Sequence, residues 1–358
     1  MINIKDLLRL KIDLLIEGVA LKGNFNLGSR ALLSSVSEGI HFVIFKDIYI
    51  TTSIQEDSSY SLCKSDTDNT IYLEGEKALS LKAELIPEGK YYGAKLLDGT
   101  LMENVGTFQT DRLRISAYKG CNFVINDESC KFCEVSQIKS QRKNGLEHIA
   151  ELVRYSECLE KRIKHYLISG GTPPEDGWGH FIDVCQTVRK NTKKSIYAMF
   201  SPPPNLEIIK QIVDAGVEDI AINIELYNSN TSAKIIKGKN RIGIDRYFEA
   251  LEYAVTLLGK KGNVKSVLVV GLENYEDTLI GVEELAKRGV MPILSIFKPV
   301  KGTPLENSPA PERNDLANIW EKSQNICERF SLTLGPLCKC CQNNTLTIPI
   351  NNQYFKYE

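Results

Sequence analysis

The feature that most constrains the fold is a regular alternation of apolar, strand-like runs with helical patterns between residues 165 and 300. The runs are HYLISGG (165–171), KSIYAMF (194–200), DIAINIEL (219–226), VKSVLVVGL (264–272) and MPILSIFKPV (291–300). Helical patterns such as LEIIKQIVDAG and YEDTLIGVEELAKRG separate them. Apolar strands separated by helices are typical of a parallel sheet that is buried on both faces. The alternation predicts an α/β layer or barrel, with functional groups at the carboxyl ends of the strands.

The residues on either side of this core have other patterns. Up to residue 110, a helical run (Ile4 to Leu21) is followed by short runs rich in β-branched and aromatic residues, with a turn at Lys46-Asp47. Such runs predict a small antiparallel sheet. After residue 305 come a helix, PERNDLANIWEKSQNICERF, and the cysteine-rich tail GPLCKCCQNN. We therefore predict a β-rich N-terminal module (1–110), an α/β core (111–305) and a short C-terminal extension (306–358).

The charge and the hydropathy of the chain indicate its binding partners and its cellular compartment. The formal net charge is -1, so no basic field favours nucleic acid or an anionic membrane. Charged residues interrupt the N-terminal segment every few positions, which excludes a signal peptide or a membrane span there. We expect a cytoplasmic protein without nucleic-acid or membrane partners. In that compartment thiols stay reduced, and clustered cysteines are metal ligands or redox groups.

Three of the ten cysteines lie close together, at Cys121, Cys130 and Cys133. Their C-x8-C-x2-C spacing falls in the loop that follows RLRISAY, the first predicted core strand. Three thiolates could bind zinc with a fourth ligand from elsewhere in the chain. They could equally hold three irons of a 4Fe–4S cluster, leaving the fourth iron open to a small chelating molecule.

Motifs follow three further predicted strands. SGGTPP (169–174) is a glycine-rich turn, and FKPVKGTPLEN (297–307) has the composition of a loop. In AINIELYN, Asn223 and Glu225 are two residues apart near a strand end, so their side chains share one face. A carboxylate in an apolar strand needs a partner. That partner is either a bound ligand or a nearby lysine such as Lys234.

Taken in this order, the motifs resemble those of the radical S-adenosylmethionine (radical SAM) superfamily over most of residues 110 to 305. The usual family spacing is C-x3-C-x2-C, so the first spacing here is longer, whereas Phe132 between the last two cysteines is typical. The resemblance implies a 4Fe–4S cluster whose open iron binds SAM through its amino and carboxylate groups. An electron from the cluster then cleaves SAM to a 5′-deoxyadenosyl radical, which abstracts a hydrogen atom from a substrate.

The resemblance also implies roles for individual residues. Gly170, Gly171 and Thr172 match the motif whose backbone takes the amino group of SAM, although the family usually has an acidic residue where Thr172 stands. Asn223 and Glu225 would contact the ribose or the methionine part of SAM, and Val269, Val270 and Gly271 the adenine. The V-x-G-T-P-L run is similar to that of biotin synthase-like enzymes and favours that branch. A small-molecule substrate and a reductant such as flavodoxin or ferredoxin are the implied partners.

The tail cysteines, a basic run and two histidines can each be interpreted as functional or as structural. Cys338, Cys340 and Cys341 in the tail could hold an auxiliary iron–sulfur cluster or be free thiols. The basic run from Lys234 to Arg241 could clamp an anionic group, but such runs are more often solvated. His165 and His180 are interpreted as structural, since a lone histidine usually is.

The residues alone are also compatible with two functions that are not enzymatic. One is a zinc-stabilised α/β binding protein without catalysis, and the other is an iron–sulfur protein that only carries electrons. The second is disfavoured because three cysteines leave one iron open. Within the radical enzymes, rearrangement, carbon–carbon cleavage and sulfur insertion are all compatible with the sequence.

Overall fold

The core of the chain is a sheet whose strands run in parallel from β8 to β15. The computed structural model describes residues 3–28, 39–65, 68–259 and 262–349. The strand order is β15-β14-β13-β12-β11-β8-β7, and only the pairing of β7 with β8 is antiparallel. These strands are β7 (Gly106–Gln109), β8 (Arg112–Ser116), β11 (His165–Ser169), β12 (Ser195–Met199), β13 (Asp219–Ala221), β14 (Val264–Val270) and β15 (Met291–Ile296). The predicted α/β core is confirmed as a partial barrel.

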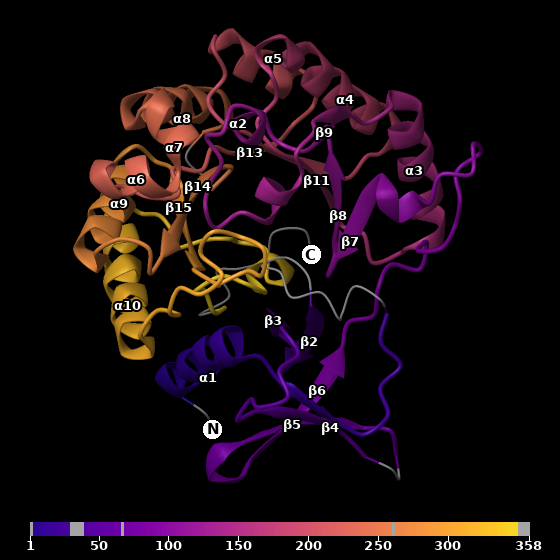
Figure 1. The fold of residues 1–358 in the computed structure, drawn as a ribbon, viewed down its shortest axis with the longest axis vertical. Coiled ribbons are helices and arrows are strands. Elements are labelled where there is room, and N and C mark those ends of the chain that lie inside the picture. Colours follow the sequence, from indigo (N-terminus) through magenta and orange to yellow (C-terminus); the bar gives the residue numbers. More distant parts are fainter. Residues whose placement is uncertain (1–2, 29–38, 66–67, 260–261, 350–358) are drawn as a thin grey trace.

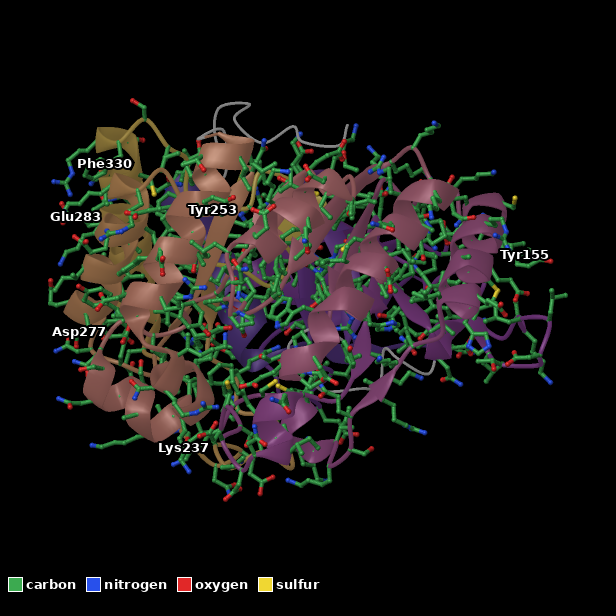
Figure 2. All side chains as sticks on the ribbon, turned by 90° about the horizontal axis from the view of Figure 1, so that it is seen from above. Tyr155, Lys237, Tyr253, Asp277, Glu283 and Phe330 are labelled. Atoms are coloured by element: carbon green, nitrogen blue, oxygen red, sulfur yellow. The ribbon has the colours of Figure 1, made fainter. Side chains whose placement is uncertain are left out.

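Helices cover the outer face of this sheet and form an arc around it (Figure 1). They are α3 (Leu146–Leu159), α4 (Trp178–Asn191), α5 (Glu207–Asp214), α8 (Ile244–Leu258), α9 (Tyr275–Lys287) and α10 (Arg313–Arg329). Apolar residues on both sides of the strands are buried, as the sequence predicted for a sheet between two layers. Charged side chains such as Lys237, Asp277 and Glu283 lie at the outer rim (Figure 2).

The N-terminal module is a separate sheet below the barrel in Figure 1, packed beside helix α1 (Ile4–Glu17). Its strands are β1 (Ala20–Lys22), β2 (Ile40–Ile44), β3 (Ile48–Thr52), β4 (Ser61–Lys64), β5 (Ile71–Gly75) and β6 (Leu79–Leu85), in the order β1-β4-β5-β6-β2-β3. The predicted turn lies between β2 and β3, where Lys46 has φ 68°. One pairing departs from the antiparallel prediction, because β1 runs parallel to β4.

The C-terminal tail joins the two sheets to each other. Gly335 N donates to Pro292 O (2.9 Å) and Leu346 N to Leu294 O (2.7 Å), so the tail covers the edge of β15. Thr51 N, in the N-terminal sheet, donates to Asn343 O (2.8 Å). The tail is therefore packed into the fold as a connecting layer. At the other boundary, the core sheet already includes β7, which lies before the predicted start at residue 111.

Buried Lys11 ties α1 to the tail and gives a testable pH dependence. Its ammonium group donates to Gln342 O (2.7 Å) and to Thr347 O, and burial lowers the pKa of Lys11 from 10.5 to about 7. Between these two values the unfolded chain binds a proton that the folded chain does not, so stability rises with pH. We expect Lys11→Met to lose this rise between pH 7 and 9.5, measured by urea unfolding at both values. Lys5→Met, at an exposed lysine, should keep it. Equal slopes in wild type and Lys11→Met would contradict the assignment.

Among the described residues, no helix combines the length and apolar character that crossing a membrane requires.

Candidate functional site

A cavity of about 770 Å³ opens at the carboxyl ends of β8, β11, β12 and β13. Active sites of α/β barrels lie at this end of the strands. The cavity brings together most of the residues predicted for the site, namely Cys121, Cys130, Phe132, Cys133, Gly170, Gly171, Thr172, Asn223 and Glu225. Its volume lies within the range of roughly 300–1,000 Å³ that is usual for small-molecule sites.

The three cysteines lie on a loop whose ends are held together by a two-stranded ribbon. This ribbon pairs β9 (Tyr118–Lys119) with β10 (Arg142–Lys143). After Cys121 the chain forms one helical turn, α2 (Asn122–Ile125), and then bends at Asp127, which has φ 56°. Cys133 N donates to Cys130 O (3.1 Å), which places the last two cysteines on one tight turn. The eight residues between the first two cysteines therefore form a compact loop, and both ends of this loop lie at the cavity.

Part of the basic run packs against this loop, although Lys234, Lys237 and Arg241 are exposed, as expected for a solvated face. Gly238 N, in α7 (Lys237–Ile242), donates to Glu128 O (3.0 Å), and Arg241 forms an ion pair with Glu128 (2.8 Å). A Cβ atom at Gly238 would lie only 2.5 Å from the Phe123 ring, so glycine allows this close approach. Gly238 and Arg241 thus hold the cysteine loop in place, whereas Lys239 of the same run lines the cavity.

The glycine turn after β11 contacts the first cysteine directly. Thr172 N donates to Cys121 Sγ (3.3 Å), and Asn122 N donates to Thr172 O (2.9 Å). A Cβ atom at Gly171 would lie 2.3 Å from Cys121 Cα and from Gly120 O, closer than any side chain tolerates. The turn therefore requires glycine at residue 171, whatever ligand the cavity holds.

Glu225 pairs with Lys239, and not with the lysine suggested by the sequence, Lys234. Lys239 Nζ lies 2.7 Å from Glu225 Oε1 and also donates to Asn223 O (3.0 Å). Both side chains of the pair are only 13% exposed. Burial alone would lower the pKa of Lys239, but the neighbouring Glu225 carboxylate outweighs it and the pKa is raised. The lysine is therefore charged inside the cavity wall.

Backbone geometry fixes the two polar side chains at the end of β13. Glu225 adopts a left-handed conformation (φ 63°), and its backbone exchanges hydrogen bonds with Val267 O (2.9 Å) and Val269 N (2.8 Å). Asn223 Oδ1 accepts from Val267 N (3.2 Å). A non-glycine residue in this region of φ is uncommon and tends to occur at functional positions.

Burial disfavours the ionisation of two of the three thiols in the protein without a metal ion. Burial raises the pKa of Cys130 to about 12 and that of Cys133 to about 11, although Lys239 opposes the shift at Cys130. Such thiols stay protonated in the protein alone, whereas a coordinated metal ion deprotonates a thiol outright. All ten cysteines lie in the described part of the chain and carry free thiols. A reduced, three-cysteine metal centre is consistent with both observations.

Comparison with known families decides between the classes of protein. The family model described as the radical SAM superfamily matches residues 115–285, which include the three cysteines and the glycine turn. Residues 115–285 of the chain belong to the radical SAM superfamily. This match favours a radical SAM enzyme over the non-catalytic zinc-binding protein and the simple electron carrier.

Similar proteins differ in their reactions. A probable dual-specificity RNA methyltransferase RlmN from Listeria welshimeri is 22% identical over 197 residues, which are 52% of this chain and 52% of the methyltransferase. A bacteriochlorophyllide c C-7(1)-hydroxylase from Chlorobaculum limnaeum is 26% identical over 39% of this chain and 36% of the hydroxylase. The radical SAM chain thus spans about half the length, or less, of these curated relatives. The crystal structure of methylornithine synthase (PylB) aligns with a TM-score of 0.49 and 17% identity over 61% of this chain and 62% of that one.

The three predicted adenine contacts, Val269, Val270 and Gly271, are not among the described residues that line the cavity. Val270 is fully buried at the end of β14, and a Cβ atom at Gly271 would lie 2.2 Å from the Pro311 ring. Gly271 therefore packs the strand end against the segment that leads into α10, and Val270 belongs to the buried core. The run after β15 does reach the cavity, through Val300 and Lys301.

The sequence did not single out several residues that the structure places in the site. Lys239 completes the ion pair, and Met199 and Ser201 line the cavity after β12. Ser201 Oγ lies 2.9 Å from Thr172 Oγ1. The position of Met199 and Ser201 at a strand end was a signal that could have identified them. The tail cysteines are not among the residues that line this cavity in the described chain.

Proposed function

We propose that this radical SAM enzyme binds a 4Fe–4S cluster through Cys121, Cys130 and Cys133 and binds SAM in the adjoining cavity. The single observation that carries the proposal is the contact between the glycine turn and the cysteine loop in one 770 Å³ cavity. When bound, the cluster supplies the electron that cleaves SAM, and the resulting 5′-deoxyadenosyl radical abstracts a hydrogen atom from a substrate. The chain itself supplies the binding, orientation and charge.

The residues around the cavity suit the polar parts of SAM. The backbone at Gly170 and Gly171 can approach a ligand closely, since neither residue has a side chain. The carboxylate of Glu225 and the amide of Asn223 present polar groups to the cavity, where they would orient the ribose or the amino acid part. Phe132 offers an apolar face beside the cysteines, which limits the access of water to the cluster.

The loop after β15 supports a place in the biotin synthase-like branch. Thr303 Oγ1 donates to Val300 O (2.7 Å) and fixes the V-x-G-T-P-L turn, while Gln137 Nε2 donates to Lys301 O (3.1 Å). These bonds hold the loop over the cavity and join it to the segment that follows the cysteines. We accordingly propose a small-molecule substrate, a reductant of the flavodoxin or ferredoxin type, and a cytoplasmic location. Rearrangement, carbon–carbon cleavage and sulfur insertion are the candidate reactions.

A specific observation favours RNA as a second candidate substrate, namely the similarity to a probable RNA methyltransferase. The net charge of -1 opposes it, because RNA-binding surfaces are strongly basic. We expect a metabolite filtrate, and not purified cellular RNA, to stimulate the formation of 5′-deoxyadenosine by the reduced enzyme. Stimulation by RNA alone would overturn the small-molecule assignment and leave the cluster assignment standing.

The cluster assignment predicts the result of removing the thiols. We expect anaerobically purified wild-type protein to contain about four irons per chain and to form 5′-deoxyadenosine from SAM and dithionite. The variant with Cys121, Cys130 and Cys133 all replaced by alanine should lose this iron and the product. Cys158→Ala, at an exposed cysteine, is the matched control and should retain both. Iron and product that persist in the triple variant would contradict the assignment.

A further inference from the structure

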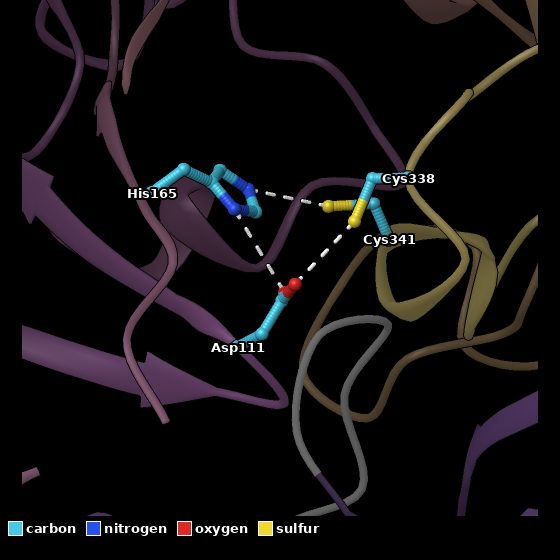
Figure 3. A group of neighbouring side chains, drawn as sticks. All are labelled: Asp111, His165, Cys338 and Cys341. Carbon is cyan, nitrogen blue, oxygen red and sulfur yellow. Dashed lines mark hydrogen bonds and ion pairs between the residues drawn. The ribbon is translucent and has the colours of Figure 1, made fainter. Parts of the chain in front are cut away.

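A second group of potential metal ligands lies outside the SAM cavity. Asp111, His165, Cys338 and Cys341 each offer one ligand atom, and these atoms all lie within 4.8 Å of one another (Figure 3). Cys341 Sγ is 3.4 Å from His165 Nε2, and Cys338 Sγ is 3.5 Å from Asp111 Oδ2. His165 Nδ1 is 3.9 Å from Asp111 Oδ1. Three distant parts of the sequence converge on this point.

Three of the four side chains are buried. His165 is fully buried, and Asp111 and Cys338 are 5% and 4% exposed. Asp111 Oδ1 accepts no hydrogen bond from any residue that the structure describes, so one oxygen of this buried carboxylate is available to a cation. The Arg112 guanidinium also lies beside the group, with Nη1 3.7 Å from Cys341 Sγ.

We propose that Asp111, His165, Cys338 and Cys341 bind one divalent transition-metal ion of the zinc type, with one ligand atom from each side chain. In a tetrahedral zinc site the bonds are about 2.0–2.3 Å long, so the ligand atoms lie roughly 3.3–3.8 Å apart. The contacts between Cys341 Sγ and His165 Nε2 (3.4 Å) and between Cys338 Sγ and Asp111 Oδ2 (3.5 Å) already have that spacing, and the whole set of four ligand atoms lies within 4.8 Å, so the group would contract by up to about 1 Å around the ion. A cubane cluster places each thiolate on a different iron, which separates the sulfurs more widely.

The donor set also selects the class of metal. Two thiolates, an imidazole and a carboxylate suit zinc, whereas magnesium and calcium prefer oxygen ligands alone. Four protein ligands leave no open position, which is characteristic of a structural site rather than a catalytic one. Cys338 and Cys341 have the C-x2-C spacing common at zinc sites. Cys340 lies outside this group, so only two of the three tail cysteines predicted as cluster ligands come together here.

The position of the site indicates what the metal would do. Asp111 immediately precedes β8 and His165 begins β11, so both stand at the amino ends of neighbouring strands. Five residues of strand separate them from the opposite, carboxyl ends, a distance of roughly 15 Å. The cysteines belong to the tail, which also contacts the N-terminal sheet. The metal would therefore fasten the tail to the base of the barrel, away from the SAM cavity.

Metal analysis of matched variants tests the proposal. We expect wild-type protein, expressed with added zinc and iron, to contain one zinc per chain besides the iron of the cysteine loop. Cys341→Ser and His165→Gln should each lower the zinc content at least tenfold and leave the iron content and 5′-deoxyadenosine formation in place. Cys340→Ser, at the neighbouring cysteine outside the group, should retain the zinc. Retained iron shows that the variants are folded.

Cobalt substitution provides a readout that needs no variant. We expect the wild-type protein with cobalt in place of zinc to show the visible absorption of tetrahedral cobalt and a thiolate-to-cobalt charge-transfer band. Three outcomes would overturn the proposal. The wild-type protein could bind neither zinc nor cobalt, or Cys340→Ser could lose zinc as completely as Cys341→Ser. Alternatively, the wild-type protein could contain about eight irons, of which half are lost in Cys341→Ser, and this would establish a second cluster.

Discussion

Gly171→Ala is expected to prevent cluster assembly and to lower 5′-deoxyadenosine formation by at least about 100-fold. The added methyl group would lie 2.3 Å from both Cys121 Cα and Gly120 O. Since these atoms belong to backbone or to the base of a side chain, the loop must move as a whole to admit it. Such a movement displaces Cys121 from the other two thiols. Iron content and product formation in anaerobically purified protein are the measurements.

Gly179→Ala is the matched control for this substitution. A Cβ atom at Gly179 meets no other atom within 4 Å, and the residue lies in the first turn of α4. Alanine favours helices over glycine by up to about 1 kcal/mol, so this variant should keep its iron and be slightly more stable. If Gly171→Ala retained wild-type iron and product formation, the glycine turn would not be positioned by the cysteine loop.

Lys239→Met is expected to lower the free energy of unfolding by about 3 kcal/mol, because it leaves the carboxylate of Glu225 buried without its ion-pair partner. Urea unfolding of the variants, without added SAM, measures the effect. Replacing both residues, as Lys239→Met with Glu225→Gln, should restore at least half of the loss, since no unpaired charge then remains.

Lys234→Met is the control for the ion pair. This lysine was the partner suggested by the sequence, but it is exposed and should change stability by less than about 0.5 kcal/mol. If Lys234→Met lowered the free energy of unfolding as much as Lys239→Met does, the ion pair between Lys239 and Glu225 would not be the source of the stability. The binding of SAM, measured by calorimetry, should weaken in Lys239→Met and remain unchanged in Lys234→Met.

The sequence predicted the barrel because periodicity is a local property. Runs such as KSIYAMF are apolar throughout and can be buried only between two layers. The ion pair could not be predicted in the same way. The helical segment breaks at Ile236, which has φ -126° and ψ 54°, and α7 then sets off in a new direction. The helix propensities of the residues around Ile236 do not predict this break. Because of the break, Lys239 rather than Lys234 lies next to Glu225.

The second group of potential metal ligands could not be predicted from the sequence for a different reason. The C-x2-C pair, Cys338 and Cys341, was obscured by Cys340 between them. Asp111 and His165 are neighbours because residues 112 and 165 pair in register on adjacent parallel strands, which the α/β pattern makes foreseeable. The return of the tail to that point is a long-range contact that spans more than two hundred residues in sequence, as in the bond between Cys338 and Asp111. No local pattern encodes such a contact.

The hydrogen bonds of the tail to β15 also impose an order on biosynthesis. Residues 335 to 346 leave the ribosome after the whole barrel has been made, yet they cover its last strand edge. Until then β15 presents unpaired backbone groups, which are a template for association with other chains. We therefore expect nascent chains, or chains truncated before residue 335, to depend on chaperones until residues 335–346 pair with β15.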